Sequence, residues 1–313
     1  MTLVPTATTP VDTADLGFTL MHEHVLVLSP GVVDNFPVWD REAELPAAVE
    51  RCRAAMARGV RTMVDLTPGD WRDVPFVVEV ARKSGMQIIV ATGLYWDPPR
   101  YFRGRSIDHM ADLFVSDITE GIMDTGVRAA IIKCATDETG VTEDVDKVLR
   151  AAARAHRRTG VPISTHTWAA GRVGLLQQDI FESEGVDLGR VTIGHSGDSD
   201  DLEYLTTMMR RGSYIGMDRF GDEVRLSTEK RVDTIARLCA MGYAHQIVLS
   251  HDASCYMDWF DREWFARERP NRVFTYIPDT IIPALKAAGV PQAQIHTMTV
   301  ENPRTIFERN HPY

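Results

Sequence analysis

Eight short apolar runs, many of them rich in β-branched residues, recur along the chain with room for a helix between most neighbouring pairs. They cover residues 20–28, 62–66, 87–92, 129–133, 161–166, 191–195, 214–217 and 246–250. Residues 88–90 and 247–249 are apolar at consecutive positions, which is typical of parallel strands covered on both faces. A strand with one polar face would alternate instead, so the pattern argues against an antiparallel sandwich.

Amphipathic segments separate these runs, and most of them stop at a glycine. They cover residues 45–58, 74–84, 110–124, 145–159, 201–211 and 229–241, and the glycines that follow are Gly59, Gly85, Gly126, Gly160, Gly212 and Gly242. Glycine at a helix C-cap followed by a short loop is the usual route back to a strand. The repetition predicts one (β/α)₈ TIM-barrel domain over residues 1–313, a fold that takes roughly 250 residues plus insertions. Periodicity alone also allows a doubly wound open sheet, although no G-x-G-x-x-G motif follows the first run.

Composition narrows the class of protein further. The formal net charge of −10 argues against a general nucleic-acid binder, which would carry a basic patch. The N-terminal residues lack the pattern of a secretory signal, and no apolar stretch approaches the roughly 18 residues of a membrane helix. We therefore expect a cytoplasmic protein that binds neither nucleic acid nor a membrane. The four cysteines form no C-x-x-C pair, so free thiols are expected rather than disulfides or a structural zinc site.

Three segments fall outside the strand and helix repeat. Residues 1–16 resemble a short hairpin that caps the barrel and turns at residues 10–12. Residues 220–230 and 253–277 are long loops after the seventh and eighth runs, and loops of that length in a compact domain are usually functional. The second loop contains Tyr256, Trp259, Phe260, Trp264, Phe274 and Tyr276. These aromatic residues would suit an apolar substrate wall, a subunit interface or a packed lid.

Residues able to bind metal stand at the ends of the apolar runs. His22 and His24 share one face of the first strand, because side chains alternate along a strand, and they can bind one metal ion. Glu23 points the other way and is interpreted as a supporting residue. His166 and His195 close the fifth and sixth runs, where barrel strands deliver catalytic residues.

Lys133 ends the fourth run, where a buried ammonium group would be costly. Three explanations stay open. The lysine could act as a neutral amine that forms a Schiff base, it could form a carbamate that bridges two metals, or it could pair with a buried acid.

Asp252 follows the eighth run directly. Its carboxylate can serve both as a metal ligand and as the acceptor of a proton from a bridging water. The neighbouring His251 would face the opposite direction and either orient nearby groups or pack in the core.

Taken together, these residues resemble the phosphotriesterase family of the amidohydrolase superfamily, and most of all its phosphotriesterase-like lactonases. The resemblance spans nearly the whole chain and rests on motifs in the family's order. They are Met21-His22-Glu23-His24, Ile132-Lys133-Cys134-Ala135, Ser164-Thr165-His166-Thr167, Ile193-Gly194-His195-Ser196-Gly197-Asp198, Gly216-Met217-Asp218-Arg219-Phe220-Gly221 and Ser250-His251-Asp252.

The resemblance implies two divalent metal ions with a hydroxide between them. It assigns His22, His24 and Asp252 to the buried metal, His166 and His195 to the exposed metal, and an N6-carboxylated Lys133 to a bridge between both. In the mechanism that it implies, the exposed metal polarises the substrate, the hydroxide attacks and Asp252 takes up the proton. Imidazole and carboxylate ligands suit zinc, cobalt, manganese and iron alike. A homodimer is also implied.

Two further residues bear on the substrate, which the resemblance implies is a small molecule. Tyr95 matches the tyrosine that lactonases of this family place near the exposed metal, and Arg219 matches an arginine at the mouth of the site. Trp96-Asp97-Pro98-Pro99 departs from the family pattern, and so does the eighth loop around residues 260–271, which puts the family's acyl-homoserine-lactone preference in doubt.

The sequence therefore predicts a hydrolase of lactones or related esters, with promiscuous phosphotriesterase activity. A phosphotriesterase or a carboxylic ester or amide hydrolase with the same metals is the nearest alternative. A metal-free Schiff-base lyase that uses Lys133, and a barrel that binds a ligand without catalysis, are alternatives of other classes.

Overall fold

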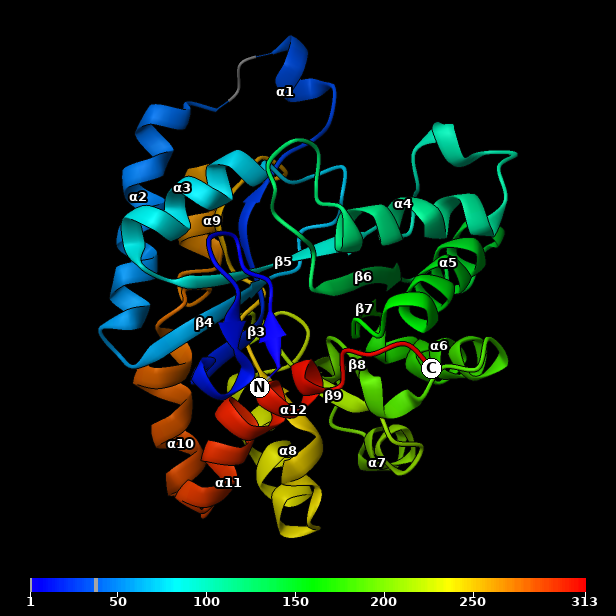
Figure 1. The fold of residues 1–313 in the computed structure, drawn as a ribbon. Coiled ribbons are helices and arrows are strands. Elements are labelled where there is room, and N and C mark those ends of the chain that lie inside the picture. The colour runs from blue at the N-terminus through cyan, green and yellow to red at the C-terminus, as the bar shows by residue number, and fades with distance from the viewer. Residues whose placement is uncertain (1, 37–38) are drawn as a thin grey trace.

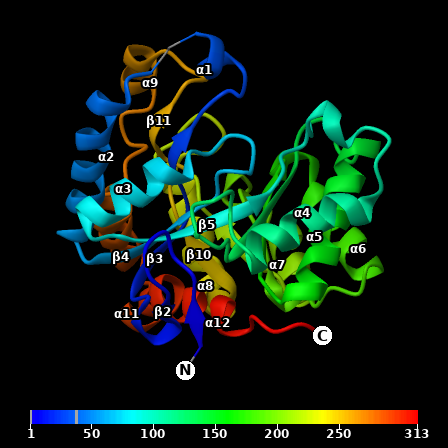
Figure 2. The ribbon, with the colours of Figure 1, turned by 45° about the horizontal axis from the view of Figure 1, so that its top comes forward.

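The computed structural model describes residues 2–36 and 39–313, and its central feature is a ring of parallel strands with helices outside it (Figures 1 and 2). The eight strands are β3 (Phe18–Val27), β4 (Val60–Asp65), β5 (Gln87–Gly93), β6 (Ile131–Thr136), β7 (Ile163–Thr167), β8 (Val191–Ile193), β9 (Tyr214–Met217) and β10 (Ile247–Leu249). Each strand pairs in parallel with the next in chain order. The predicted (β/α)₈ barrel is confirmed, with strand boundaries that differ by only a few residues.

The barrel closes through the segment after β10. Asp252 N donates to His22 O at 3.0 Å, and His24 N donates to Ala253 O at 2.9 Å. The chain then continues as β11 (Ser254–Met257), which pairs in parallel with β3. The sequence predicts one long loop over residues 253–277, but this segment contains β11 and α9 (Arg262–Glu268). The strand was missed because it is only four residues long and has no clear alternation of polar and apolar positions.

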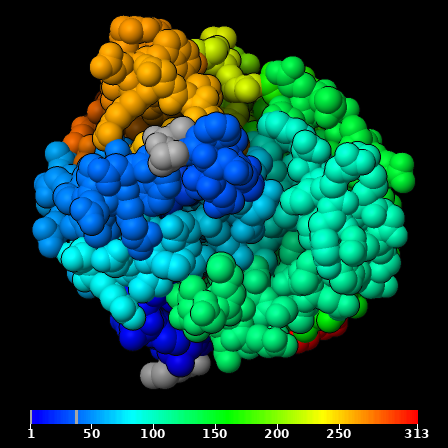
Figure 3. All heavy atoms as spheres, turned by 90° about the horizontal axis from the view of Figure 1, so that it is seen from above, coloured from blue at the N-terminus to red at the C-terminus, as the bar shows by residue number. Residues whose placement is uncertain are grey.

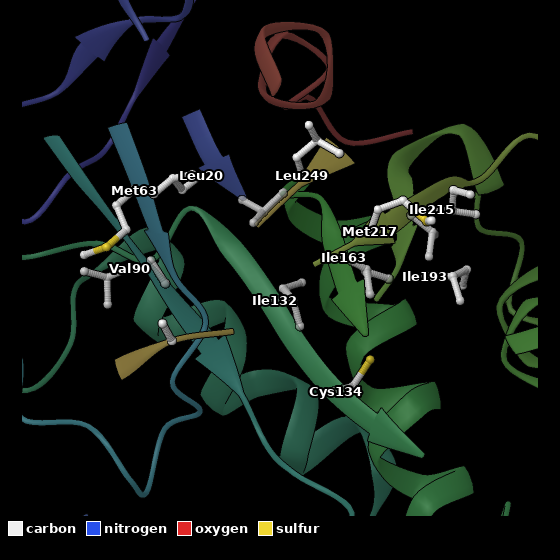
Figure 4. Close-up of a cluster of buried hydrophobic side chains, with 14 of the residues drawn as sticks. Leu20, Met63, Val90, Ile132, Cys134, Ile163, Ile193, Ile215, Met217 and Leu249 are labelled. Carbon is white, nitrogen blue, oxygen red and sulfur yellow. The ribbon is translucent and has the colours of Figure 1, made fainter. Parts of the chain in front are cut away.

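Helices cover the outer faces of the strands. They are α2 (Arg41–Met56), α3 (Val74–Ser84), α4 (Ile107–Thr119), α5 (Glu143–Thr159), α6 (Val173–Ser183), α7 (Leu202–Arg210) and α8 (Thr228–Ala240), followed by α10 (Ile282–Ala287), α11 (Gln292–His296) and α12 (Asn302–Glu308). Figure 4 shows part of the core between the two layers, with Leu20, Ile132 and Leu249 among the strand residues. In the part of the chain that the structure describes, no helix is long and apolar enough to cross a membrane.

Two helical expectations needed correction. Helix α4 ends at Thr119 rather than near residue 124, so Gly126 lies in the turn beyond the helix and does not cap it. Helix α6 was missed because its buried face carries polar residues. Gln177 Nε2 donates to His166 O at 2.8 Å, and Gln178 Nε2 donates to Met208 O at 3.0 Å. These amides satisfy carbonyl groups of the core but interrupt the apolar periodicity that identifies a helix.

The first residues form the predicted hairpin at the end of the barrel where the strands begin. Strands β1 (Leu3–Val4) and β2 (Val11–Asp12) pair antiparallel, so Val11 and Asp12 belong to the second strand and the turn precedes them. Residue 1 of this hairpin lies outside the described residues. Val4 belongs to a buried cluster with Phe307 of α12 and with side chains from inside the barrel. The barrel interior is thus a packed core that is closed at this end, which leaves the opposite end for a site.

The opposite end carries the longer loops. Figure 3 shows α1 (Val32–Asn35, blue) and the segment that contains α9 (orange) close together on the surface. All four cysteines are buried and free, as expected, with Cys52 on α2 and Cys255 on β11.

Candidate metal centre

The carboxyl ends of the strands bring all six predicted ligand residues together. His22 and His24 come from β3, Lys133 from β6 and His166 from β7. His195 and Asp252 follow the ends of β8 and β10 within three residues. All six line one cavity of about 690 Å³. Each is at least nine-tenths buried: His22, His24, Lys133, His166, His195 and Asp252.

Short distances connect these side chains. His22 Nε2 lies 2.9 Å from Lys133 Nζ and 3.7 Å from Asp252 Oδ1. His24 Nε2 lies 3.1 Å from Asp252 Oδ1. His195 Nε2 lies 3.9 Å from the other oxygen of Asp252. The residues therefore form one continuous cluster centred on the Asp252 carboxylate.

His195 and Asp252 have backbone φ angles of 55° and 54°, in the left-handed region that residues other than glycine seldom adopt. Such conformations cost of order 1–3 kcal/mol and persist where the surrounding structure holds them. Here Asp218 Oδ1 accepts a hydrogen bond from His195 N at 2.8 Å, and Asp252 N is tied to β3. The strain turns both side chains into the cavity just beyond their strands.

Asp218 orients two of the imidazoles. His22 Nδ1 lies 2.8 Å from Asp218 Oδ2, and His195 Nδ1 lies 2.9 Å from Asp218 Oδ1. Burial raises the pKa of Asp218, and in its ionised form, which only accepts, both Nδ1 atoms carry the proton and donate it to the carboxylate. The Nε2 lone pairs of His22 and His195 then point into the cluster, as in histidines that bind a metal.

The other two imidazoles are held in the same way by different partners. Thr67 donates its hydroxyl proton to Asp65 at 2.5 Å, so it must accept from His24 Nδ1, which lies 2.9 Å away. His166 Nε2 donates to Asp137 Oδ2 at 3.2 Å. Consequently the inner nitrogens, Nε2 of His24 and Nδ1 of His166, also present lone pairs.

Pairs of acceptor atoms therefore face each other at short range. His166 Nδ1 and His195 Nε2 are 3.0 Å apart, and His24 Nε2 and Asp252 Oδ1 are 3.1 Å apart. Two lone pairs at these distances repel unless a cation or a proton donor stands between or beside them, and Tyr95 OH, 2.7 Å from His166 Nδ1, can donate to only one of the four atoms. The donor set, four oriented imidazoles with a carboxylate, thus has the chemistry of a site for divalent transition metals. His22, His24 and Asp252 in particular form a group with the spacing of metal ligands.

Burial sets the charge state of the cluster. It lowers the pKa of Lys133 to about 8 and that of His166 to about 4, and it holds the pKa of His195 well below its usual value. Burial alone would raise the pKa of Asp252, but the positive charge of Arg272 holds it well below its usual value. His166 and His195 are therefore neutral and Asp252 is ionised at neutral pH, as metal ligation requires.

Sequence reasoning missed the supporting residues Asp218, Asp137 and Thr67. Asp218 directly follows β9 and Asp137 directly follows β6, so both stand at the same end of the barrel as the predicted ligands. This position at a strand end marks both residues as candidates for the site. Only the tertiary structure shows which imidazole each of them contacts.

Glu23 supports the closure of the barrel, in agreement with its interpretation as a supporting residue. Its Oε1 accepts from Ser250 Oγ at 2.7 Å and from His251 N and Nδ1 at 3.0 and 2.5 Å, and its Oε2 accepts from Ala253 N at 2.9 Å. His251 Nε2 in turn accepts from Ile277 N at 2.9 Å. This network fixes the residues on either side of Asp252.

Substitution of Glu23 by glutamine is expected to destabilise the protein. The amide nitrogen of glutamine is a hydrogen-bond donor, and it would face the donor groups that now bond the Glu23 carboxylate. Each buried polar group that loses its partner costs about 1–3 kcal/mol. We expect a clear fall in the midpoint of thermal unfolding. The control Glu50→Gln changes an exposed glutamate on α2 and should leave the midpoint unchanged. Equal midpoints for the two variants would show that the network does not stabilise the closure.

Aromatic residues form much of the cavity wall. Those that line it are Trp71, Tyr95, Trp96, Trp168, Trp259, Phe260, Trp264 and Phe265. Tyr95 OH lies 2.7 Å from His166 Nδ1, which places the tyrosine beside the predicted ligands. In the segment that departs from the family pattern, Trp96 contacts Tyr95 with ring centroids 4.0 Å apart and ring planes tilted by 40°, whereas Asp97 and the two prolines line a separate surface pocket.

Arg219 also lines the cavity, and only 8% of its surface is exposed. Its Nε donates to Asp252 Oδ2 at 3.0 Å and one terminal nitrogen donates to Asp198 at 2.8 Å. The side chain therefore joins two carboxylates rather than standing free at the mouth.

Comparisons with known proteins agree on one family. The model of the phosphotriesterase family matches residues 2–307. A phosphotriesterase homology protein of Mycobacterium tuberculosis is 50% identical, over 98% of both chains, and an aryldialkylphosphatase of Saccharolobus solfataricus is 42% identical over 95% of this chain and 96% of its own. The solved structure of the phosphotriesterase from Mycobacterium tuberculosis is similar with a TM-score of 0.96 at 49% identity, and it covers 99% of this chain and 100% of that one. The chain belongs to the phosphotriesterase family, and it is accordingly a metal-dependent hydrolase.

Proposed function

We propose that this protein hydrolyses lactones with a pair of divalent metal ions. The proposed ligands are His22, His24 and Asp252 for the buried ion, His166 and His195 for the exposed ion, and N6-carboxylated Lys133 as a bridge. The observation that carries the proposal is the set of lone pairs that face one another at 3.0 and 3.1 Å. When bound, the metals would polarise the substrate carbonyl and supply a water of lowered pKa as nucleophile.

The residues of the chain have distinct proposed roles. Asp252 takes up the proton of the attacking water, because it is the carboxylate at the centre of the cluster. Arg219 and Arg272 hold Asp252 Oδ2 at 3.0 and 3.1 Å and keep it ionised before the reaction. Burial raises the pKa of Tyr95 well above its usual value, so the phenol stays protonated and can donate to an oxygen of the substrate.

Lysine carboxylation is supported by the position of Lys133. Its Nζ lies 2.9 Å from an imidazole nitrogen, inside a cluster that already contains Arg219 and Arg272 near Asp252. A carbamate would replace a buried cation by a carboxylate that faces the proposed metals. The Schiff-base alternative uses the same lysine without metals, and trapping with borohydride in the presence of substrate would support it.

A second candidate activity is hydrolysis of phosphotriesters, which the name of the 42% identical relative, aryldialkylphosphatase, favours. A site that stabilises a tetrahedral oxyanion also suits a phosphoryl centre. The proposed lactone preference is supported by Tyr95, whose hydroxyl lies beside His166 where a lactone oxygen would approach.

A substrate panel tests the proposal. Purified protein loaded with zinc, cobalt or manganese should open γ-lactones and acyl-homoserine lactones with a kcat/KM about 100-fold above that for a phosphotriester, as differential transition-state binding allows. Absence of lactone turnover, or a higher kcat/KM for the phosphotriester, would reject the lactonase assignment.

We further propose one hydrolase domain over residues 1–313 that works as a cytoplasmic homodimer on a small-molecule substrate. The family resemblance supports the dimer. Light scattering of the metal-loaded protein should give twice the mass of one chain, and a monomer would reject this part of the proposal.

A further inference from the structure

Four arginines line the cavity that holds the metal cluster: Arg219, Arg225, Arg269 and Arg272. Three of them have close carboxylate partners. Arg219 and Arg272 bond Asp252 at 3.0 and 3.1 Å, and Arg269 lies 3.5 Å from Asp222. The positive charges of these three arginines are therefore largely balanced by carboxylates of the protein itself.

Arg225 is different, because it has a single ion pair among the described residues and that pair is long. Its Nε lies 3.8 Å from Asp198 Oδ2. Both oxygens of Asp198 are already engaged, since Oδ1 accepts from Arg231 at 2.7 Å and Oδ2 accepts from Arg219 at 2.8 Å. Three arginines thus approach Asp198, and because Arg219 also bonds Asp252 and Arg231 bonds Asp198 closely, the charge of Arg225 is the least compensated of the three.

The guanidinium of Arg225 is placed to receive a ligand. It lies 4.7 Å from the ring centroid of Trp168, which also lines the cavity, and the side chain stays 34% exposed. A guanidinium that lies over an indole ring keeps the N–H groups at its own edge free, and they can make a bidentate contact with an anion. A purely structural arginine would be expected to spend these donors on the protein, as Arg231 does with three partners.

Arg225 is also close to the proposed chemistry. Arg225 lies 3.8 Å from Asp198, Asp198 accepts a hydrogen bond from Arg219 at 2.8 Å, and Arg219 donates to Asp252 at 3.0 Å. Because Arg225 and the cluster residues line the same cavity, one substrate molecule can place an anionic group at Arg225 and its carbonyl at the cluster.

We propose that Arg225 is a specificity-determining residue that selects substrates with a carboxylate or similar anionic arm next to the hydrolysed lactone or ester. The inference rests on the proposed hydrolase function and narrows its substrate class. The exposed aromatic residues at the rim, Trp259, Phe260 and Trp264, would contact the apolar remainder of such a substrate.

Matched esters test the proposal on the metal-loaded enzyme. The monoester of glutaric acid with 4-nitrophenol has an anionic arm, and its methyl diester is neutral and otherwise nearly the same. We expect the ratio of kcat/KM, anionic over neutral, to fall about 10-fold or more in Arg225→Gln, the loss expected for one charge-assisted hydrogen bond. Arg225→Lys should recover much of the ratio. The ratio for the wild type should also decrease with added salt.

Arg267→Gln is the matched control, because it removes the same charge from an exposed arginine of α9 outside the cavity. Its ratio should equal that of the wild type. Equal ratios in Arg225→Gln and the wild type, or equal losses for both esters, would overturn the role of Arg225.

A binding measurement separates this inference from the proposed activity. The monoanilide of glutaric acid and its methyl ester are titrated by calorimetry against the wild type and Arg225→Gln. Tighter binding of the acid by the wild type, by about 10-fold and lost in the variant, supports anion selection even if no ester is hydrolysed. Equal affinity of the acid for both proteins overturns it, whatever the activity.

Discussion

Replacement of Lys133 by alanine is expected to remove bound metal and activity together. Lys133 is 1% exposed and its Nζ lies against His22 Nε2, where only a neutral or carboxylated side chain suits a metal site. Without the proposed bridge, the two ions lose a shared ligand. We expect kcat/KM for a lactone to fall at least about 10³-fold, roughly 4 kcal/mol of transition-state stabilisation. Metal analysis after gel filtration should show fewer ions per chain.

The matched control is Lys286→Ala, which changes an exposed lysine of α10. It should retain the metal content and kcat of the wild type. Mass spectrometry under mild conditions should show the carbamate on Lys133 in the wild type. Full activity of Lys133→Ala with two metals bound would disprove the bridging role, and a borohydride-trapped adduct at Lys133 would favour the lyase alternative instead.

Substitution of Asp252 by asparagine is expected to lower kcat strongly. The amide has nearly the shape of the carboxylate but cannot accept the proton of the attacking water, and general-base catalysis typically contributes about 10²–10⁴-fold. It would also weaken the contacts that Arg219 and Arg272 make to Asp252 Oδ2. We expect kcat for lactones to fall by about 10³-fold, with metal content measured in parallel so that ligation and proton transfer are distinguished.

Asp124→Asn provides the control, since Asp124 is exposed and lies in the turn after α4. It should behave as the wild type in kcat, KM and metal content. A kcat for Asp252→Asn within threefold of the wild type would show that another group accepts the proton.

Much of the fold could be predicted from the sequence because parallel barrel strands are buried on both faces. Continuous apolar runs such as residues 88–90 therefore identify strands without knowledge of their neighbours. Elements in which local pattern and burial disagree cannot be recognised in this way. The buried face of α6 contains Gln177 and Gln178, and the four residues of β11 have no distinctive pattern, so neither element was recognised.

The candidate ligands were also predictable, for a geometric reason. A barrel directs the ends of all its strands toward one axis, so His22, Lys133 and His166 converge although they lie far apart in sequence. Which imidazole each supporting residue contacts was not predictable. Asp218 contacts both His22 and His195, and no spacing along the chain indicates that pairing.

The sequence by itself determined the barrel and the residues that its strand ends present, because periodic burial and strand polarity are local properties of the chain. Only the tertiary structure decided which nitrogen of each imidazole faces the centre, how Glu23 fixes the segment around Asp252, and that Arg225 has a weakly compensated charge. These features depend on distances of a few ångströms between segments far apart in sequence, and on the competition of several donors for one carboxylate. Such competition is settled by packing in three dimensions and is not encoded in any single stretch of residues.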